Sequence, residues 1–188
     1  MNLELESMAI EMPEVEGHPN RVGFRGVLTF VGVPSDRSPS GARGHRVTIP
    51  RKVVDDAIPS LLGMALDYAP TWDRHDVRRK VGIITRAEVV GRTLEVGGYL
   101  YAKDFPDIVE EVMRSGRRPS GQQAAQAGAA IDALGMSYEV TDVEVMNWQE
   151  KVWVLTRATF TGAAILRRQN AAYRQTWIEL ESVKEEAK

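Results

Sequence analysis

The segments KVGIITRAEVV (80–90) and RTLEVGGYLYA (92–102), separated by Gly91, decide the fold. Both are rich in β-branched and aromatic residues, which favour strands, and glycine is a frequent turn residue. Two such segments joined by a short turn predict an antiparallel hairpin.

The flanking sequence adds further strands on both sides of this hairpin. Strand composition recurs at VGFRGVLTFVGV (22–33), HRVTI (45–49), GMSYEVTDVEV (135–145) and KVWVLTRATF (151–160). Helices are predicted over RKVVDDAI (51–58), FPDIVEEVMRS (105–115) and AAILRRQNAAYRQTWIELESV (163–183), the last as a closing amphipathic helix. The segment 116–130 has no apolar period, and we expect a mobile loop there.

The strands follow one another instead of alternating with helices, so a parallel α/β sheet is not expected. The predicted class is α+β: a mainly antiparallel β-barrel with flanking helices. One domain should cover residues 21–180, preceded by a tail or edge strand (1–20) and followed by a charged end (181–188).

Composition removes several classes of function. The chain of 188 residues has no cysteine and a formal net charge of −2, which excludes thiolate nucleophiles and cysteine-ligated zinc and gives no general attraction to nucleic acid. Phosphate-binding glycine motifs, metal-binding motifs and long apolar runs are also missing from the sequence. We therefore expect no cofactor, no metal, no nucleic-acid partner and no membrane partner, and a cytoplasmic protein.

What remains is a hydroxyl nucleophile assisted by histidine. His75 lies at the entrance to the strand-dense region, between Asp73 and Asp76, although a solvated surface histidine is the commoner meaning of such a pattern. Ser137 begins a strand after a glycine, where a simple edge-strand serine is the alternative. The strand period of two places Met136 and Tyr138 on one face, and Ser137 and Glu139 on the other, open face.

The order of several motifs resembles the prohead proteases of tailed bacteriophages, a family similar in fold to the herpesvirus assemblins. These motifs are the His75-Asp76 pair, VGIIT (81–85), DFPDIVEEV (104–112), LGMSYEV (134–140) and ATFTGAAIL (158–166). The resemblance covers residues 22–177. In that family the histidine base precedes the serine nucleophile by a long interval, as His75 precedes Ser137 here.

The resemblance implies a serine endopeptidase that cleaves scaffold and capsid-protein segments, and often itself, during procapsid maturation. Ser137 would be the nucleophile and His75 the general base. Phage scaffold and the major capsid protein would be its partners, inside the assembling procapsid in the host cytoplasm. A homo-oligomer is left open, and the charged C-terminal end could lead into a scaffold segment.

The third catalytic member departs from the family pattern, because no histidine follows Ser137. Thr159 matches best by position, and Glu139 is the alternative. The assemblins use an arginine pair near the oxyanion, and Arg167 and Arg168 lie at a comparable distance after the serine, although solvated arginines on a helix are the more ordinary meaning.

Two other functions stay open at this stage. The chain could be a catalytically inactive scaffold or shell component that retains the barrel, which the missing third member favours. It could also be an unrelated β-barrel binding module.

Overall fold

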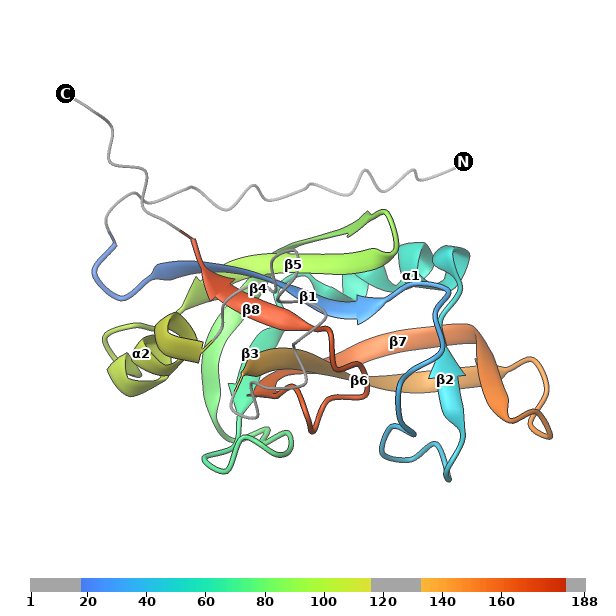
Figure 1. Cartoon of the computed structure of the whole chain (residues 1–188). Coiled ribbons are helices and arrows are strands. Elements are labelled where there is room, and N and C mark those ends of the chain that lie inside the picture. The colour runs from blue at the N-terminus through green and yellow to red at the C-terminus, as the bar shows by residue number, and fades with distance from the viewer. Residues whose placement is uncertain (1–17, 116–132, 182–188) are drawn as a thin grey trace, which may run out of the picture.

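The computed structural model describes residues 18–115 and 133–181. In these ranges eight strands form a single mixed sheet in the order β2-β7-β3-β4-β5-β1-β8, with β6 paired to β7 (Figure 1). The strands are β1 (Val22–Phe30), β2 (Arg46–Thr48), β3 (Ala65–Tyr68), β4 (Lys80–Val90), β5 (Thr93–Leu100), β6 (Leu134–Val145), β7 (Val152–Arg167) and β8 (Trp177–Leu180). The helices are α1 (Arg51–Ala57), a 3-10 turn η1 (Ile58–Leu61) and α2 (Pro106–Ser115).

The predicted hairpin is confirmed as β4 and β5, and it forms the middle of the sheet. Gly91 in its turn has φ +59°, a conformation that glycine adopts without the steric cost of a Cβ. At Gly98 a Cβ would overlap the carbonyl oxygen of Ile83 on β4, so only glycine allows the two strands to approach as they do. β1 pairs with the other edge of β5, also antiparallel.

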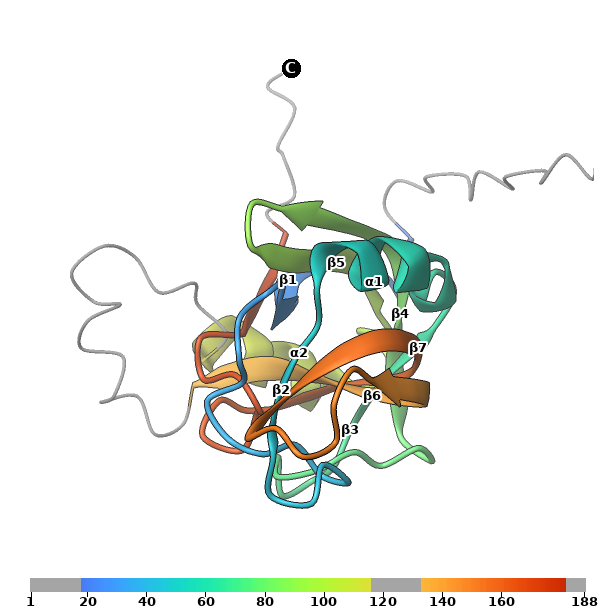
Figure 2. The same ribbon diagram turned by 90° about the vertical axis from the view of Figure 1, so that its right-hand side faces the viewer.

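The sheet is strongly curled, as the 90° view in Figure 2 shows, with β1 and β5 on one side and β6 and β7 on the other. The main hydrophobic core is built from side chains of both sides. Met136 on β6 packs against Gly26 on β1, and its N–H donates to Thr176 Oγ1 at 3.2 Å, just before β8. The two ends of the sheet therefore approach each other and form a half-barrel.

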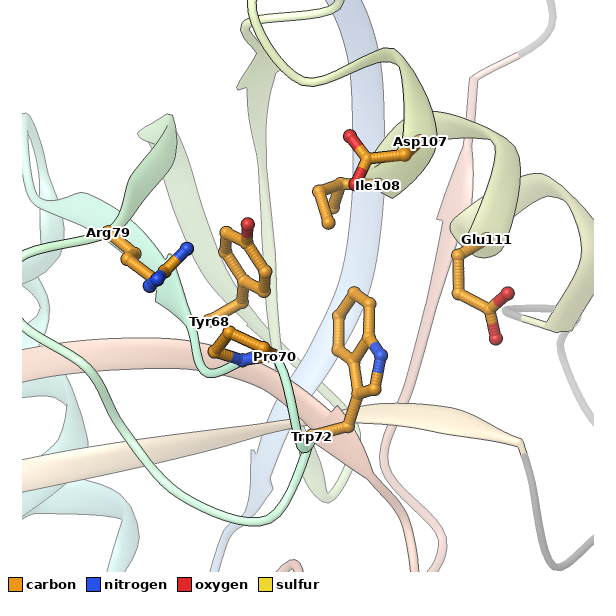
Figure 3. Close-up of a pocket in the computed structure, with 7 residues that line it drawn as sticks. All are labelled: Tyr68, Pro70, Trp72, Arg79, Asp107, Ile108 and Glu111. Carbon is orange, nitrogen blue, oxygen red and sulfur yellow. The ribbon is translucent and has the colours of Figure 1, made fainter.

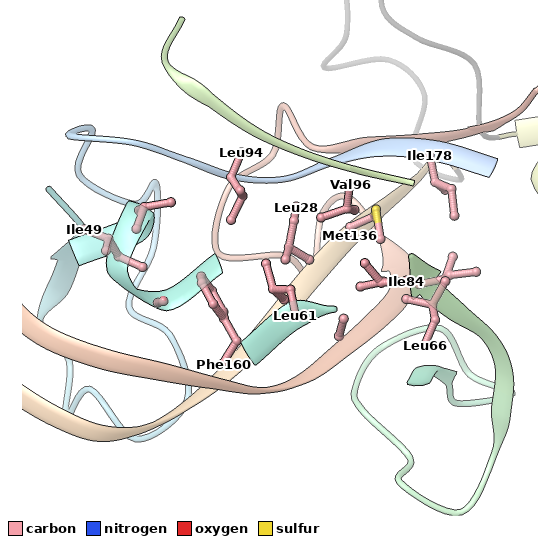
Figure 4. Packing of buried hydrophobic residues seen from close by; sticks show 14 of the residues in the cluster. Leu28, Ile49, Leu61, Leu66, Ile84, Leu94, Val96, Met136, Phe160 and Ile178 are labelled. Atoms are coloured by element: carbon pink, nitrogen blue, oxygen red, sulfur yellow. The ribbon is translucent and has the colours of Figure 1, made fainter. Parts of the chain in front are cut away.

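The core fills the inside of this curve (Figure 4). Most of its largest fully buried side chains come from the strands together with η1, and they include Phe24, Leu28, Leu61, Leu66, Ile84, Leu94 and Met136. Helices α1 and α2 lie at opposite ends of the molecule (Figure 1), and each buries apolar side chains, such as Val54 and Ile108, in the same core. Within the described ranges, none of the helices has the length and apolar character that crossing a membrane requires.

The predicted closing helix is wrong. Residues up to Arg167 extend β7, the chain then turns, and only Trp177–Leu180 returns as a short strand. The residues Ala163 to Leu166 are all buried, because one face of β7 packs on the main core and the other forms a small cluster with Ala171. A strand buried on both faces has no alternation of apolar and polar residues, so its sequence is easily taken for a helix.

The sheet is mixed: it is mainly antiparallel, as the sequence predicts, but not purely so. β7 pairs in parallel with β2 and, further along, with β3, while the remaining pairs are antiparallel. The sequence did not predict β3, and it is this strand that brings an additional acid to the candidate site. The predicted tail before residue 18, the loop at 116–130 and the charged end from residue 182 lie outside the described residues.

Candidate active site

Three adjacent strands place Ser137 and a buried acid, Asp67, in one cross-strand row. Ser137 on β6 and Asp67 on β3 are both in register with Ala164 on β7, which lies between them. Residues in register on neighbouring strands direct their side chains to the same face, and strands are about 4.8 Å apart. The main chains at Ser137 and Asp67 are thus about 10 Å apart by that spacing, separated only by the small side chain of Ala164.

The loop 69–79, between β3 and β4, carries His75 to this row. His75 Nδ1 lies 3.5 Å from Asp67 Oδ2 and 3.9 Å from Glu139 Oε1, and its side chain is only 13% exposed. Both ring nitrogens are buried and have no hydrogen-bond partner among the described residues. A separation of 3.5 Å is longer than a hydrogen bond, and catalytic contacts commonly shorten when substrate binds.

Asp67 is held in a fixed orientation at the base of this arrangement. It is fully buried; its Oδ1 accepts the backbone N–H of Asp76 at 3.1 Å, and its Oδ2 lies 3.5 Å from Lys80 Nζ. A buried carboxylate is tolerated when it is paired and hydrogen-bonded in this way. Because Asp76 follows His75 directly, the same hydrogen bond fixes the loop beside the imidazole.

The Asp76 side chain pairs with two arginines of the loop. It accepts the Arg78 N–H at 3.1 Å and pairs with the Arg78 and Arg79 side chains. The hydrogen bond from the Arg78 N–H holds the pKa of Asp76 below its ordinary value.

The predicted faces of β6 are confirmed. Met136 is buried in the core and Tyr138 packs against it, whereas Ser137 is half-buried and Glu139 is exposed. Glu139 leans over Gly162 of β7, where a Cβ would lie 2.8 Å from the carboxylate, so the glycine leaves the space that this side chain occupies. Glu139 thereby lies close to His75, as the alternative role of third catalytic member would require.

Thr159 is not brought to His75. It is in register with Thr141 and lies five residues before Ala164 on β7, which at 3.3 Å per residue is about 16 Å along the strand from the level of Ser137. Of the two candidates for the third position, only Glu139 is close to the imidazole.

The arginine pair occupies a strand end and a turn, not a helix. Arg167 closes β7, and its N–H donates to the Trp72 carbonyl at 2.8 Å. Arg168 is buried, with Nε donating to the Leu134 carbonyl at 3.0 Å, and burial lowers its pKa. In register, Arg167 faces Leu134, three residues before Ser137, so the pair lies about 10 Å along the sheet from the serine. An oxyanion role for the pair stays a prediction.

A pocket of about 420 Å³ opens beside the loop 69–79, which carries His75 (Figure 3). Trp72 stands between Tyr68 and helix α2, which contributes Asp107, Ile108 and Glu111, and the remaining walls are Pro70 and Arg79. The Trp72 carbonyl is held by the Arg167 N–H and by Asn170 Nδ2, at 2.8 and 3.2 Å. The backbone that carries the pocket wall is thereby attached to the end of β7.

Sequence reasoning missed Asp67 and Lys80. One sequence signal pointed to Asp67: it is an acid between the apolar residues Leu66 and Tyr68. An acid in an apolar segment is a candidate for a functional site. In the part of the chain that the structure describes, no group of three or more His, Asp or Glu side chains could hold a metal ion.

Neither a protein-family model nor a curated protein matches this chain. Among solved structures, the varicella-zoster virus protease is similar, with a TM-score of 0.46 and 12% sequence identity. The likeness covers 87% of this chain and 65% of the viral protease chain. At this identity the likeness does not extend to individual site residues, and it assigns the chain to no family.

Proposed function

We propose that the protein is a serine endopeptidase with Ser137 as nucleophile, His75 as general base and Asp67 as the acid that orients the base. The observation that carries this proposal is the contact of His75 Nδ1 with the buried Asp67, on the sheet face that Ser137 shares. Serine, histidine and a buried carboxylate in this relation suit acyl transfer.

The proposed reaction begins when the Ser137 hydroxyl attacks a peptide carbonyl and His75 Nε2 accepts its proton. The Nδ1–H then donates to Asp67 Oδ2, and the carboxylate stabilises the imidazolium. His75 next gives the proton to the departing amine, which leaves an acyl ester on Ser137. Water, deprotonated by the same histidine, hydrolyses that ester and restores the serine.

Charge that develops on the substrate carbonyl oxygen requires donors placed in advance. Arg167 and Arg168, together with backbone N–H groups near the start of β6, are the proposed source. The pocket beside Trp72 is the proposed site for a substrate side chain, because three of its wall residues, Pro70, Trp72 and Arg79, belong to the loop that carries His75.

The finer role we propose is capsid maturation in a tailed phage. The substrates would be scaffold and major capsid protein, and the enzyme itself, inside the assembling procapsid in the host cytoplasm. This part rests on the order of the sequence motifs around His75 and Ser137. The inactive-scaffold alternative drew its support from the missing third member, a position that Asp67 fills in this proposal.

The test uses a fluorophosphonate probe, which reacts with activated serines, followed by peptide mapping by mass spectrometry. We expect one label, on Ser137, and loss of labelling in both Ser137→Ala and His75→Ala. Ser38→Ala is the matched control, because Ser38 lies in a surface loop and bonds only to nearby backbone. Labelling of Ser137→Ala at the wild-type rate, or no labelling of the folded wild-type protein, would reject the proposal.

A further inference from the structure

The lysine Lys80 and the imidazole of His75 both lie close to the same carboxylate oxygen of the buried Asp67. His75 Nδ1 and Lys80 Nζ each lie 3.5 Å from Asp67 Oδ2. The carboxylate is fully buried, while the Lys80 side chain is 39% exposed at the first residue of β4. The lysine therefore reaches from solvent to the same atom that orients the histidine.

This sharing matters because a buried negative charge needs a nearby positive one. A neutral imidazole cannot supply it, although a general base must be neutral before it accepts a proton. If Asp67 had only His75 as a partner, the pair would favour the imidazolium, which is the inactive form of the base. Lys80 provides the balancing charge without involving the histidine.

We propose that Lys80 is a positioning residue that keeps Asp67 ionised while leaving His75 neutral in the resting enzyme. The catalytic meaning of this role rests on the proposed function; the electrostatic arrangement does not. Lys80 would also hold Asp67 Oδ2 toward the imidazole, so that the acid is in place when His75 becomes charged during attack.

Other charged groups near His75 also affect the balance between its neutral and its protonated form. Glu139, on β6, lies 3.9 Å from Nδ1, and its negative charge favours the imidazolium, opposite to the effect of Lys80. Asp76, in the loop, is paired with Arg78 and Arg79 and so contributes little net charge. Among the described residues, Lys80 is the cation paired with Asp67.

The direct experiment measures the pKa of His75 by NMR titration in a Ser137→Ala background, which prevents self-cleavage. Lys80→Met should raise the pKa of His75 by about one unit, because an opposite charge within ~4–6 Å acts on that scale once its counter-charge is removed. Lys52→Met is the matched control: Lys52 forms a similar pair with Asp56, at 2.8 Å, but on α1. That variant should leave His75 unchanged.

Lys80→Gln is a second variant that retains a donor for Asp67 while removing the charge, in case Lys80→Met does not fold. It should raise the pKa of His75 in the same direction, and Lys80→Arg should restore the wild-type value. In the enzyme with Ser137 intact, the rising limb of kcat/KM against pH should move upward with the same variants. A purely structural role would lower the plateau without moving the midpoint.

The outcomes distinguish the proposed role of Lys80 from the proposed protease function. A pKa of His75 that is unchanged or lower in folded Lys80→Met and Lys80→Gln overturns the role of Lys80, even if the protein is a protease. Unfolding of both variants, with Lys52→Met folded, overturns it too, since Lys80 would then be needed for the fold alone. A raised pKa in a protein that hydrolyses nothing supports the electrostatic role and rejects the proposed function instead.

Discussion

Two rows across the same pair of strands, β6 and β7, differ in what surrounds them. The row through Ser137 and Ala164 continues onto β3, where Asp67 is buried and the following loop returns His75. The row through Thr141 and Thr159 also carries hydroxyl groups, but in the described pairing β3 meets β7 only at Ala163–Ile165 and β2 only at Val152–Val154. A hydroxyl on a strand is common; the third strand is what turns one of these rows into a candidate catalytic site.

The sharpest way to break this comparison is to substitute one residue in each row, the acid Asp67 in the first and the hydroxyl of Thr159 in the second. Asp67→Asn should lower kcat/KM on the order of 10³- to 10⁴-fold, because the amide no longer holds the imidazole in the required tautomer or stabilises its charged form. Thr159→Val should change it by less than about 2-fold, as expected for a substitution away from the site. The measurement is hydrolysis of a peptide substrate by both purified variants.

Thermal midpoints must accompany these rates, since Asp67 is buried and its loss could also unfold the protein. A folded Asp67→Asn variant with near wild-type activity would reject the assignment of the third member. A large effect at Thr159 would return that role to the residue that the sequence favoured.

A smaller effect is expected at Glu139, which touches the same imidazole from a solvated position. Glu139→Gln removes a negative charge beside the imidazole. We expect a loss of kcat/KM below about 3-fold, because the side chain is 47% exposed and solvent screens its charge.

Glu144→Gln provides the matched control on the distal part of β6, where Glu144 pairs with Arg157 at 2.9 Å. The pH profile of this variant should coincide with that of the wild type. If Glu139→Gln abolished activity as completely as loss of the serine, Glu139 and not Asp67 would be the orienting acid.

The smallest effect on catalysis is expected on the other face of β6. Tyr138 packs edge-on against Phe160, and its hydroxyl has no hydrogen-bond partner among the described residues. Tyr138→Phe should keep kcat/KM within about 2-fold and should not lower stability at pH 7, because it removes an unsatisfied polar atom.

The same substitution has a signature at high pH. Burial raises the pKa of Tyr138 from 10.0 to about 12. Between these values the unfolded chain releases a proton that the folded protein retains, so wild-type stability should fall as pH rises from 10 to 12. Urea unfolding at pH 8 and pH 11 should show a smaller loss for Tyr138→Phe, though not none, because burial also raises the pKa of Tyr173. Equal losses would indicate that the Tyr138 hydroxyl is solvated.

Local patterns predicted a large part of the molecule. The β4–β5 hairpin has strand composition on both sides of a glycine turn, α2 has apolar residues at helical spacing, and α1 begins directly after Pro50. The period of two on β6 also placed Ser137 on the open face. These features depend on neighbours in the sequence, and such signals survive in a single chain.

What failed depends on contacts between distant segments. β3 has only four residues and pairs with β7 in parallel, without the turn that marks a hairpin. Asp67 therefore joins the row of Ser137 through a pairing that leaves no local pattern, whereas the sequence pattern indicates only Thr159 or Glu139 as the third member. The sequence at the end of β7 predicts a helix because both faces of this strand are covered and apolar residues do not alternate with polar ones.

The parallel pairing of β3 with β7 also has a consequence for when the candidate site can form. Contacts between segments so far apart in sequence form slowly, because a long loop must close before they contribute any stability. Asp67 and His75 are made before β7 during synthesis, yet Asp67 enters the row of Ser137 only when β7 is in place. A nascent or partly folded chain would thus lack an assembled site, and the proposed proteolysis would be delayed until the whole sheet has formed.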